Sequence, residues 1–380
     1  MKVLVIGGGI IGLMTALELS QAGCEVNVLD SQDLGQAASW AGGGILSPMY
    51  PWRYPLAVNQ LARYGRDIYQ HWQPILQAAT GQDIEINPSG MLILDPADFD
   101  IGLNWAAYMQ DSQQAAQLLN AAQLQALIPP LNPSIEQGLW FSQLANIRNP
   151  RLLKTLIAFL QLQPNVSLHA HCAVRKFETY TNSNQINAVI DQHGQRWHAD
   201  HYVMASGAWS GLLSQSLNWQ APVKPIQGQM ILFKTPPNWL PSMLMQDGIY
   251  LIPRLDGHIV CGSSTDDIGF DTQVNTAIGE HLQAVAYRLM PTLRDMPRVK
   301  AWAGLRPSVP DGVPYIGQAP KLENLWLNTG HFRNGLVMAP ASARLLKQQI
   351  LGETPFINTQ AYLPRNRLKP ASTQIILENT

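Results

Sequence analysis

Cysteine and long apolar runs are the first things that this chain of 380 residues lacks. Its three cysteines, Cys24, Cys172 and Cys261, are scattered and form no Cys-x-x-Cys pair, which argues against a disulfide framework and against a structural zinc site. No run approaches the roughly 18 consecutive apolar residues of a membrane helix, and the first residues do not read as a signal peptide. We therefore expect a cytoplasmic protein without a membrane span.

An excess of charge of either sign is missing as well. The chain has 25 basic and 26 acidic side chains, a formal net charge of −1, and only 13% charged residues. This balance offers neither the basic surface that nucleic acids need nor a polybasic patch for membranes, so we expect small molecules as partners. The length favours two domains. Composition does not decide the oligomeric state, and a homo-oligomer is compatible with it.

The N-terminal segment has the pattern strand, glycine turn, helix, strand. Val3–Ile6 is apolar, Gly7, Gly9 and Gly12 follow it, and a second apolar strand ends at Asp30. In dinucleotide-binding folds such glycines allow a tight turn, close approach to a pyrophosphate and close packing of helix on strand, and the acid accepts from a ribose hydroxyl. The pattern predicts a dinucleotide site. A tight turn in some other α/β fold would not require Asp30.

The choice of dinucleotide depends on two further glycine segments. An acid at position 30 suits NAD and FAD and argues against a 2′-phosphate. Gly42, Gly43 and Gly44 follow soon after the second strand, and residues 330–335 lead directly into the last helix, whose positive N-terminal end could face a flavin ring. Either segment alone could be a flexible loop or a helix start. Together with the first motif they favour FAD.

Patterns typical of a parallel sheet occur at the start, in the middle and at the end of the chain, with antiparallel patterns between them. We therefore predict an α/β fold in which an FAD-binding Rossmann-like domain is interleaved with a mixed antiparallel-sheet substrate domain. The predicted FAD-binding domain comprises residues 1–50, 140–220 and 300–355. The predicted substrate domain comprises residues 51–139 and 221–299, and residues 356–380 form a C-terminal tail.

Several collinear segments resemble a known family. Residues 3–30, 39–44 and 205–209 are similar to the D-amino-acid oxidase superfamily of FAD-dependent oxidoreductases. Residues 248–254 and 304–307, with the 330–335 segment, narrow the resemblance to its glycine oxidase-like members. The matches extend to about residue 350, nearly the whole chain.

The resemblance, together with the glycine motif, implies a set of cofactor contacts along the chain. These are Gly7, Gly9, Ile10, Ile11, Gly12, Asp30, Ser31, Ala38, Ser39, Gly42, Gly43, Gly44, Val174, Gly207, His331, Phe332, Arg333, Asn334, Gly335, Leu336 and Val337. Family members whose flavin is covalently attached use a cysteine late in the chain. None follows Cys261 here, so the FAD is expected to be non-covalent.

Substrate contacts of the family carry over to Tyr250, Arg306 and Arg333. The residue types are suitable, because a guanidinium offers a carboxylate two parallel donors and a tyrosine hydroxyl can add a third. Each of the three could also have a purely structural role: Tyr250 could cap a sheet, Arg306 could be a solvated loop charge, and Arg333 could hold loop backbone. We assign no general base, since hydride transfer needs orientation more than proton transfer.

The reaction that the resemblance implies is oxidative deamination of glycine, small D-amino acids or N-methylglycine-type amines. A hydride passes from Cα to flavin N5, the imine hydrolyses to a 2-oxo acid and ammonia, and molecular oxygen reoxidises the flavin to give hydrogen peroxide. One alternative is a D-amino-acid dehydrogenase of the same fold that passes electrons to a quinone or carrier. The other is a dinucleotide-binding protein without turnover.

Two further features leave alternatives open. His169 and His171 alternate on one predicted strand, but no third ligand is evident, so we predict no metal site. The aromatic stretch that includes Trp40 and residues 50–54 could cover the substrate pocket and alter its specificity, or it could pack on the domain surface or at a subunit contact.

Overall fold

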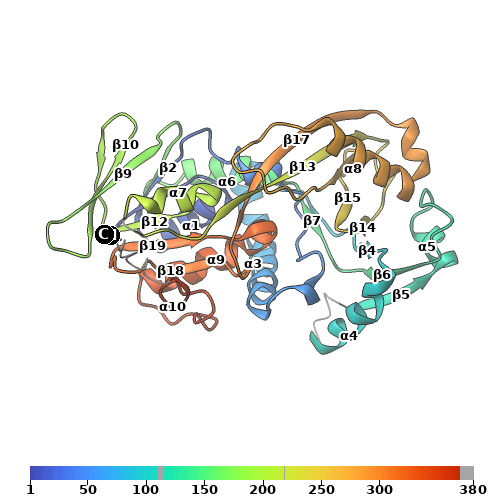
Figure 1. Cartoon of the computed structure of the whole chain (residues 1–380), viewed down its shortest axis with the longest axis horizontal. Coiled ribbons are helices and arrows are strands. Elements are labelled where there is room, and N and C mark those ends of the chain that lie inside the picture. Colours follow the sequence, from blue (N-terminus) through green and yellow to red (C-terminus); the bar gives the residue numbers. More distant parts are fainter. Residues whose placement is uncertain (110–114, 218, 369–380) are drawn as a thin grey trace, which may run out of the picture.

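The computed structural model describes residues 1–109, 115–217 and 219–368. At one end of the molecule is a six-stranded sheet (Figure 1), in the order β18-β19-β12-β1-β2-β8. Every neighbouring pair in it is parallel except β18–β19. Its strands are β1 (Lys2–Ile6), β2 (Glu25–Leu29), β8 (Val166–His169), β12 (His201–Met204), β18 (Tyr315–Gln318) and β19 (Leu325–Thr329).

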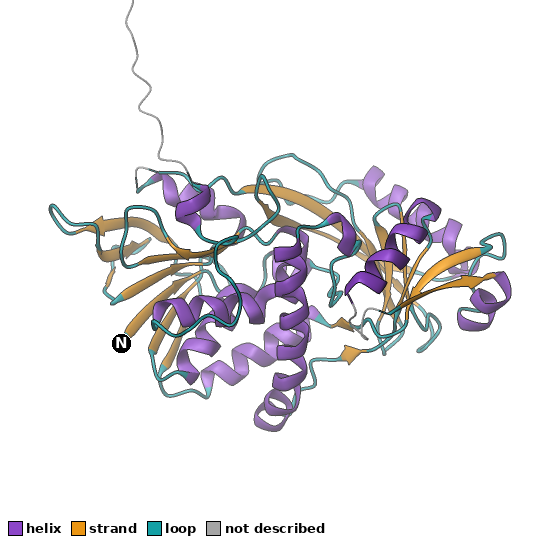
Figure 2. Ribbon diagram, turned by 90° about the horizontal axis from the view of Figure 1, so that it is seen from below, coloured by secondary structure: helices purple, strands orange, loops and turns teal. Residues whose placement is uncertain are grey.

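Both faces of this sheet are covered, which explains the continuous apolar run of β1. Successive strand residues point to opposite faces. Val3 and Val5 pack with the helices that Figure 2 shows gathered beside the sheet, and Leu4 and Ile6 pack toward β9 and β10. The helices are α1 (Ile10–Gln21), α3 (Leu56–Thr80), α6 (Asn149–Gln161) and α9 (Gly335–Ile350). The opposite layer is β9 (Val174–Thr179), β10 (Ile186–Asp191) and β11 (Arg196–Trp197).

An eight-stranded sheet occupies the other end, in the order β17-β13-β16-β15-β14-β4-β6-β5. All neighbouring pairs are antiparallel except β14–β4. Figure 1 shows the long strands β13 and β17 extending from the centre of the molecule into this sheet. Its strands are β4 (Met91–Ile93), β5 (Ala116–Asn120), β6 (Gln137–Phe141), β13 (Lys224–Lys234), β14 (Met243–Gln246), β15 (Ile249–Pro253), β16 (His258–Gly262) and β17 (Arg298–Ser308).

Smaller elements complete the described chain. Helix α8 packs against the eight-stranded sheet through Leu282 and Val285, and the short pair β3–β7 lies between the glycine-rich loop and the second sheet. These smaller helices and strands are β3 (Ile86–Asn87), β7 (Asn146–Ile147), α2 (Ala38–Ala41), α4 (Phe99–Met109), α5 (Ala121–Leu127), α7 (Ser210–Gln215), α8 (Thr276–Leu289) and α10 (Pro364–Arg367). Among the described residues, no helix has the length and apolar character needed to cross a bilayer.

The predicted fold class is confirmed, since a largely parallel sheet and a mixed, mainly antiparallel sheet are built from interleaved segments. The exact division into two domains stays a prediction. Two elements pack with the other part than the one predicted for them: α3, from the predicted substrate domain, packs with the six-stranded sheet, and β17, mostly from the predicted FAD-binding domain, pairs with β13 in the eight-stranded sheet. Of the predicted tail, residues 356–368 are described, and Tyr362 among them is fully buried, with its hydroxyl donating to the Ala57 carbonyl at 2.8 Å. Residues 369–380 lie outside the described part.

Candidate cofactor and substrate site

A cavity of about 650 Å³ lies outside the carboxyl ends of β1, β2, β12 and β19. Segments that directly follow these strands, at Gly7, Asp30, Ala205 and His331, line one wall. The opposite wall comes from β13, β15 and β17 of the other sheet. Ligands of open parallel sheets bind at this edge, and the volume is within the range of about 300–1,000 Å³ that is usual for cofactor pockets.

The first glycine motif forms a turn that only glycines fit. Gly7 has a φ of +112°, and a Cβ there would lie 2.5 Å from the carbonyl oxygen of Ala205. A Cβ on Gly12 would lie 1.8 Å from the carbonyl oxygen of Gly7, so the third glycine lets α1 pack onto β1. At the start of α1, the Ile10 N–H donates to Ser39 Oγ at 2.9 Å. The turn therefore brings main-chain N–H groups to the cavity wall, where a pyrophosphate can bind.

Asp30 is fixed at the end of β2 by two main-chain donors. Gly8 N–H donates to its Oδ2 at 2.6 Å, and Gln32 N–H donates to its Oδ1 at 2.9 Å. Partial burial raises the pKa of this carboxyl, and the bonds from Gln32 and Gly8 oppose that rise. The carboxylate lies on the cavity wall, where its remaining acceptor positions can take a ribose hydroxyl.

The second glycine segment packs closely against residues of β15, β7 and α6. A Cβ on Gly43 would lie 2.7 Å from Ile252 Cδ1 and 3.0 Å from Tyr250 Cε2. Gly44 has a φ of +82°, and a Cβ there would lie 2.0 Å from the Ile147 carbonyl oxygen. Asn149 at the start of α6 donates to the Ser39 carbonyl at 2.8 Å and so holds the same wall. This loop is thus part of a rigid wall, not a flexible connection.

The segment after β19 turns into α9 beside the cavity. Gly330 and Phe332 both have positive φ, of +86° and +48°, and the His331 imidazole is fully buried with its Nε2 3.0 Å from Ser342 Oγ. The N-cap residue of α9, Asn334, makes no side-chain bond to the helix start. Asn334, Gly335 and Leu336 line the cavity, so the positive N-terminal end of α9 lies at its wall.

Burial of His331 predicts a pH-dependent stability. Desolvation lowers the pKa of this imidazole from 6.5 to about 3. Between these values the unfolded chain binds a proton that the folded chain does not, so the free energy of unfolding falls as the pH falls from 6.5 toward 3. Between pH 7.5 and pH 5 we expect the free energy of unfolding to fall by about 1–2 kcal/mol more in the wild type than in His331→Gln. Urea unfolding of both at these pH values tests this; equal losses would contradict it.

Arg306 faces the cavity from β17 and is held by the opposite strand and the segment after β16. Its Nη1 donates to the carbonyl oxygens of Gln227, at 3.3 Å, and Ser264, at 3.1 Å, and its Nη2 donates to Ser263 Oγ at 2.6 Å. Within the described residues the guanidinium has no carboxylate partner, and the Tyr250 side chain lies within hydrogen-bonding reach of it. Burial lowers the pKa of Arg306, while the neighbouring Tyr250 opposes that change. A bound anion therefore meets no competing carboxylate of the described residues at this fork.

Tyr250 and Arg333 lie beside Arg306. The Tyr250 hydroxyl, on β15, donates to Met230 Sδ at 3.4 Å, and its side chain is 7% exposed. Arg333 is half-buried, donates to Thr265 Oγ1, and is close enough for its charge to lower the pKa of Arg306. The structure thus brings together all three residues that the sequence predicted for the substrate.

Most predicted cofactor residues line the same cavity, and two do not. Gly12 packs α1 on β1, and Val337 is buried inside α9. Those that line it are Gly7, Gly9, Ile10, Ile11, Asp30, Ser31, Ala38, Ser39, Gly42, Gly43, Gly44, Val174, Gly207, His331, Phe332, Arg333, Asn334, Gly335 and Leu336. The pair His169 and His171 lies elsewhere, with hydrogen bonds to Asn27 and Asp33.

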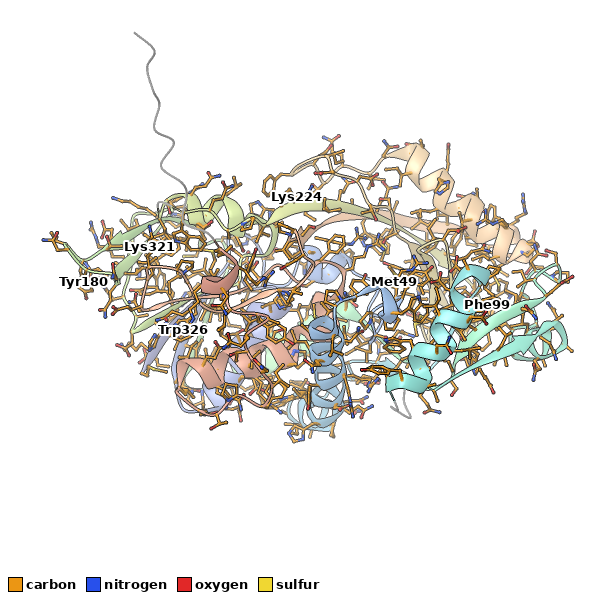
Figure 3. The ribbon with its side chains drawn as sticks, turned by 60° about the horizontal axis from the view of Figure 1, so that its bottom comes forward. Met49, Phe99, Tyr180, Lys224, Lys321 and Trp326 are labelled. Atoms are coloured by element: carbon orange, nitrogen blue, oxygen red, sulfur yellow. The ribbon has the colours of Figure 1, made fainter. Side chains whose placement is uncertain are left out.

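Sequence reasoning missed several lining residues, including Met49, Asn149, Gly228, Met230 and Ser263. Figure 3 shows Met49 between Trp326 of the first sheet and Phe99 at the other end of the molecule. For Gly228 a signal existed, because a glycine within a strand often marks a close approach of another group. The others are apolar or small polar residues whose sequence context carries no signal.

The aromatic stretch does not form a cover over the cavity. The side chains of residues 50–54 are absent from its lining. Trp52 packs against Trp105 and Phe141, with its Nε1 donating to Asp98 at 2.7 Å, and Tyr50 donates to Asp95 at 2.8 Å. Tyr50 and Trp52 thus pack against other side chains of the chain, while Tyr54 is close enough to Arg306 to oppose the lowering of its pKa.

FAD is compatible with the residues present. Two buried polar atoms without a partner among the described residues, Asn149 Oδ1 and His331 Nδ1, belong to side chains of the lining. Asp30 is the one carboxylate among the described residues that line the cavity. These features suit a dinucleotide bound along the wall and provide no carboxylate base near Arg306.

Comparison with known proteins agrees with this site. Residues 2–349 match the family model DAO, FAD dependent oxidoreductase. Glycine oxidase from Pseudomonas putida is 43% identical over 97% of this chain and 99% of its own length. The Bifunctional protein ThiO/ThiG from Trichormus variabilis is 32% identical over 92% of this chain and 52% of its own length. The crystal structure of glycine oxidase from Geobacillus kaustophilus superimposes with a TM-score of 0.90 at 22% identity, covering 97% of this chain and 99% of that one.

The family model spans nearly the whole chain, including every segment that lines the cavity. FAD is accordingly the cofactor of this protein, and the glycine turn, Asp30 and the two later glycine segments surround its candidate site. The chain belongs to the DAO family of FAD-dependent oxidoreductases.

Proposed function

We propose that this oxidoreductase carries out the oxidative deamination of glycine, and of small D-amino acids or N-methylglycine-type amines, with molecular oxygen as electron acceptor. The observation that carries the proposal is the Arg306 guanidinium, which no carboxylate of the described residues pairs with, beside the Tyr250 hydroxyl inside the cavity that suits FAD. The relative from Pseudomonas putida that is named glycine oxidase supports the same substrate class.

In this proposal Arg306 binds the substrate carboxylate. Its guanidinium offers the two parallel donors that match a carboxylate, and Ser263 and the Ser264 carbonyl fix the plane of the fork. Tyr250 adds a hydroxyl donor from β15 of the same sheet. Arg333, which the Thr265 hydroxyl holds, adds a second positive charge at the same end of the cavity.

The same charges favour the reactive form of the amine. Two guanidinium groups close to a bound amino acid lower the pKa of its ammonium, because a like charge disfavours the charged form. The amine can then lose its proton to water without a protein base. Apolar Met49 and Met230 limit water around Tyr250. When bound, FAD supplies the two-electron acceptor for the hydride of the substrate Cα.

We further propose that FAD is held without a covalent bond and that the protein is cytoplasmic. Cys172 is the one cysteine among the described residues that line the cavity, and burial raises its pKa to about 12, which keeps it a thiol. Acid precipitation of the holoenzyme is expected to leave all flavin in the supernatant. Flavin that stays with the protein pellet would contradict this part of the proposal.

The activity is tested with the purified holoenzyme and glycine, sarcosine, D-alanine and D-proline in turn. We expect loss of flavin absorbance without oxygen, and release of hydrogen peroxide under air with at least one of these substrates. Flavin reduction without peroxide under air would instead indicate a dehydrogenase that uses a quinone or carrier. A holoenzyme that none of the four substrates reduces would contradict amino-acid oxidation altogether.

A further inference from the structure

Arg254 is a buried arginine that lies outside the cavity and that the proposed reaction does not use. It directly follows β15 and is 5% exposed. Its Nη2 donates to the carbonyl oxygen of Gly43 at 2.8 Å, and its Nη1 donates to Asn146 Oδ1 at 2.8 Å and to the Ile147 carbonyl at 3.0 Å. One side chain therefore joins the end of β15, the glycine loop and β7.

The guanidinium has no direct carboxylate partner among the described residues. The nearby carboxylates are engaged elsewhere: Glu85 binds Arg148 at 3.1 Å and Arg151 at 3.2 Å, and Asp256 binds Arg148 at 2.8 Å. Burial lowers the pKa of Arg254 to about 10, which leaves it charged near neutral pH. A buried charge without an ion pair costs several kcal/mol, so a function that only this residue provides is expected at such a position.

The glycine loop rests on the strand that carries Tyr250. Tyr250, Ile252 and Arg254 alternate along the chain and share one face. Gly43 lies against the first two so closely that a Cβ on it would be 2.7 Å from Ile252 and 3.0 Å from Tyr250, and its carbonyl oxygen accepts from Arg254. Gly42, Gly43 and Gly44 line the cavity. The cofactor wall and the substrate strand thus meet at this contact.

We propose that Arg254 is a positioning residue that holds the Gly42–Gly44 loop on β15 and so fixes the distance between the FAD wall and the substrate residues Tyr250 and Arg306. It acts through the main chain of Gly43 and touches neither substrate nor cofactor. The forked guanidinium is needed because its two Nη atoms donate to different segments: Nη2 bonds the loop and Nη1 bonds β7. A lysine ammonium is a single point donor and reaches only part of this set.

The proposal is tested with Arg254→Met, Arg254→Lys and the matched control Arg148→Met. Arg148 belongs to the same charged cluster, but its side chain bonds Glu85 and Asp256 and does not bond the loop. For Arg254→Met we expect at least a tenfold rise in the FAD dissociation constant and faster amide hydrogen exchange of residues 42–47 in the apoprotein. In both measurements Arg254→Lys is expected to give values between those of the wild type and Arg254→Met. Arg148→Met is expected to match the wild type.

A kinetic measurement separates positioning from general stability. Because Tyr250 and Arg306 stay on the sheet, KM for glycine should change less than threefold, while kcat falls at least tenfold. This kinetic measurement depends on the proposed glycine oxidation. FAD affinity and hydrogen exchange do not depend on it, so these two measurements test the role of Arg254 even if glycine is not a substrate. Wild-type FAD affinity and wild-type exchange at 42–47 in folded Arg254→Met, or in Arg254→Lys if the methionine variant does not fold, would overturn the proposal.

Discussion

Replacing Arg306 by glutamine is expected to lower kcat/KM for glycine by roughly a hundredfold or more, mostly through KM. No carboxylate of the described residues pairs with the guanidinium, so the substrate carboxylate has no protein competitor for it. A charged bidentate bond of this kind is worth about 3 kcal/mol, and glutamine keeps neither the charge nor the fork. Steady-state peroxide release at varied glycine concentration measures the effect.

Two further variants show whether a loss at Arg306 is specific. Arg298→Gln removes an exposed arginine from the same strand, so wild-type kinetics are expected. Gly228→Ala keeps the arginine at position 306. The added Cβ would lie 2.0 Å from the Nη2 and 2.2 Å from the Cζ of Arg306, so its guanidinium must shift. We expect a raised KM with unchanged FAD affinity. If both Arg306→Gln and Gly228→Ala keep wild-type KM, Arg306 does not bind the substrate.

The second large effect is expected for Gly44→Ala, which should purify with little or no FAD. The residue has a φ of +82°, and the added Cβ would lie 2.0 Å from the Ile147 carbonyl oxygen and 2.4 Å from Asn149 Oδ1. The left-handed conformation costs an L-residue about 1–2 kcal/mol, and the forced movement of main chain adds about 1–3 kcal/mol. The displaced loop is the wall that suits FAD, so its binding should weaken by about 2–5 kcal/mol, or roughly 30-fold or more.

The matched control for Gly44 is Gly23, at the end of α1. Gly23 has a φ of +81°, almost the same conformation, but a Cβ there meets nothing within 4 Å. Gly23→Ala should therefore show the conformational cost alone, as a lower melting temperature with wild-type FAD affinity. Fluorescence titration of the apoproteins with FAD compares the two. Equal FAD affinities of both variants and wild type would show that the loop at Gly44 is not part of the cofactor site.

Local patterns were sufficient for the elements that begin the fold. The apolar run of β1, the glycine turn and Asp30 follow one another within a short segment, so their contacts depend on few distant residues. The same holds for the turn from β19 into α9, where glycines mark positive φ values. Elements whose partners are far away were missed. Residues Ala116–Asn120, for example, form a strand because they pair along their length with β6.

The sequence by itself determined the dinucleotide turn and the α/β class, and its resemblance to a known family pointed to Tyr250, Arg306 and Arg333, which lie together at the cavity. Only the tertiary structure decided how they are held: Gly228 beneath the Arg306 guanidinium, Ser263 on its Nη2, and Arg254 between β15 and the glycine loop. These contacts join strands and loops that are far apart along the chain. Pairing of distant strands sets them, and no local pattern of residue types records which strands will pair.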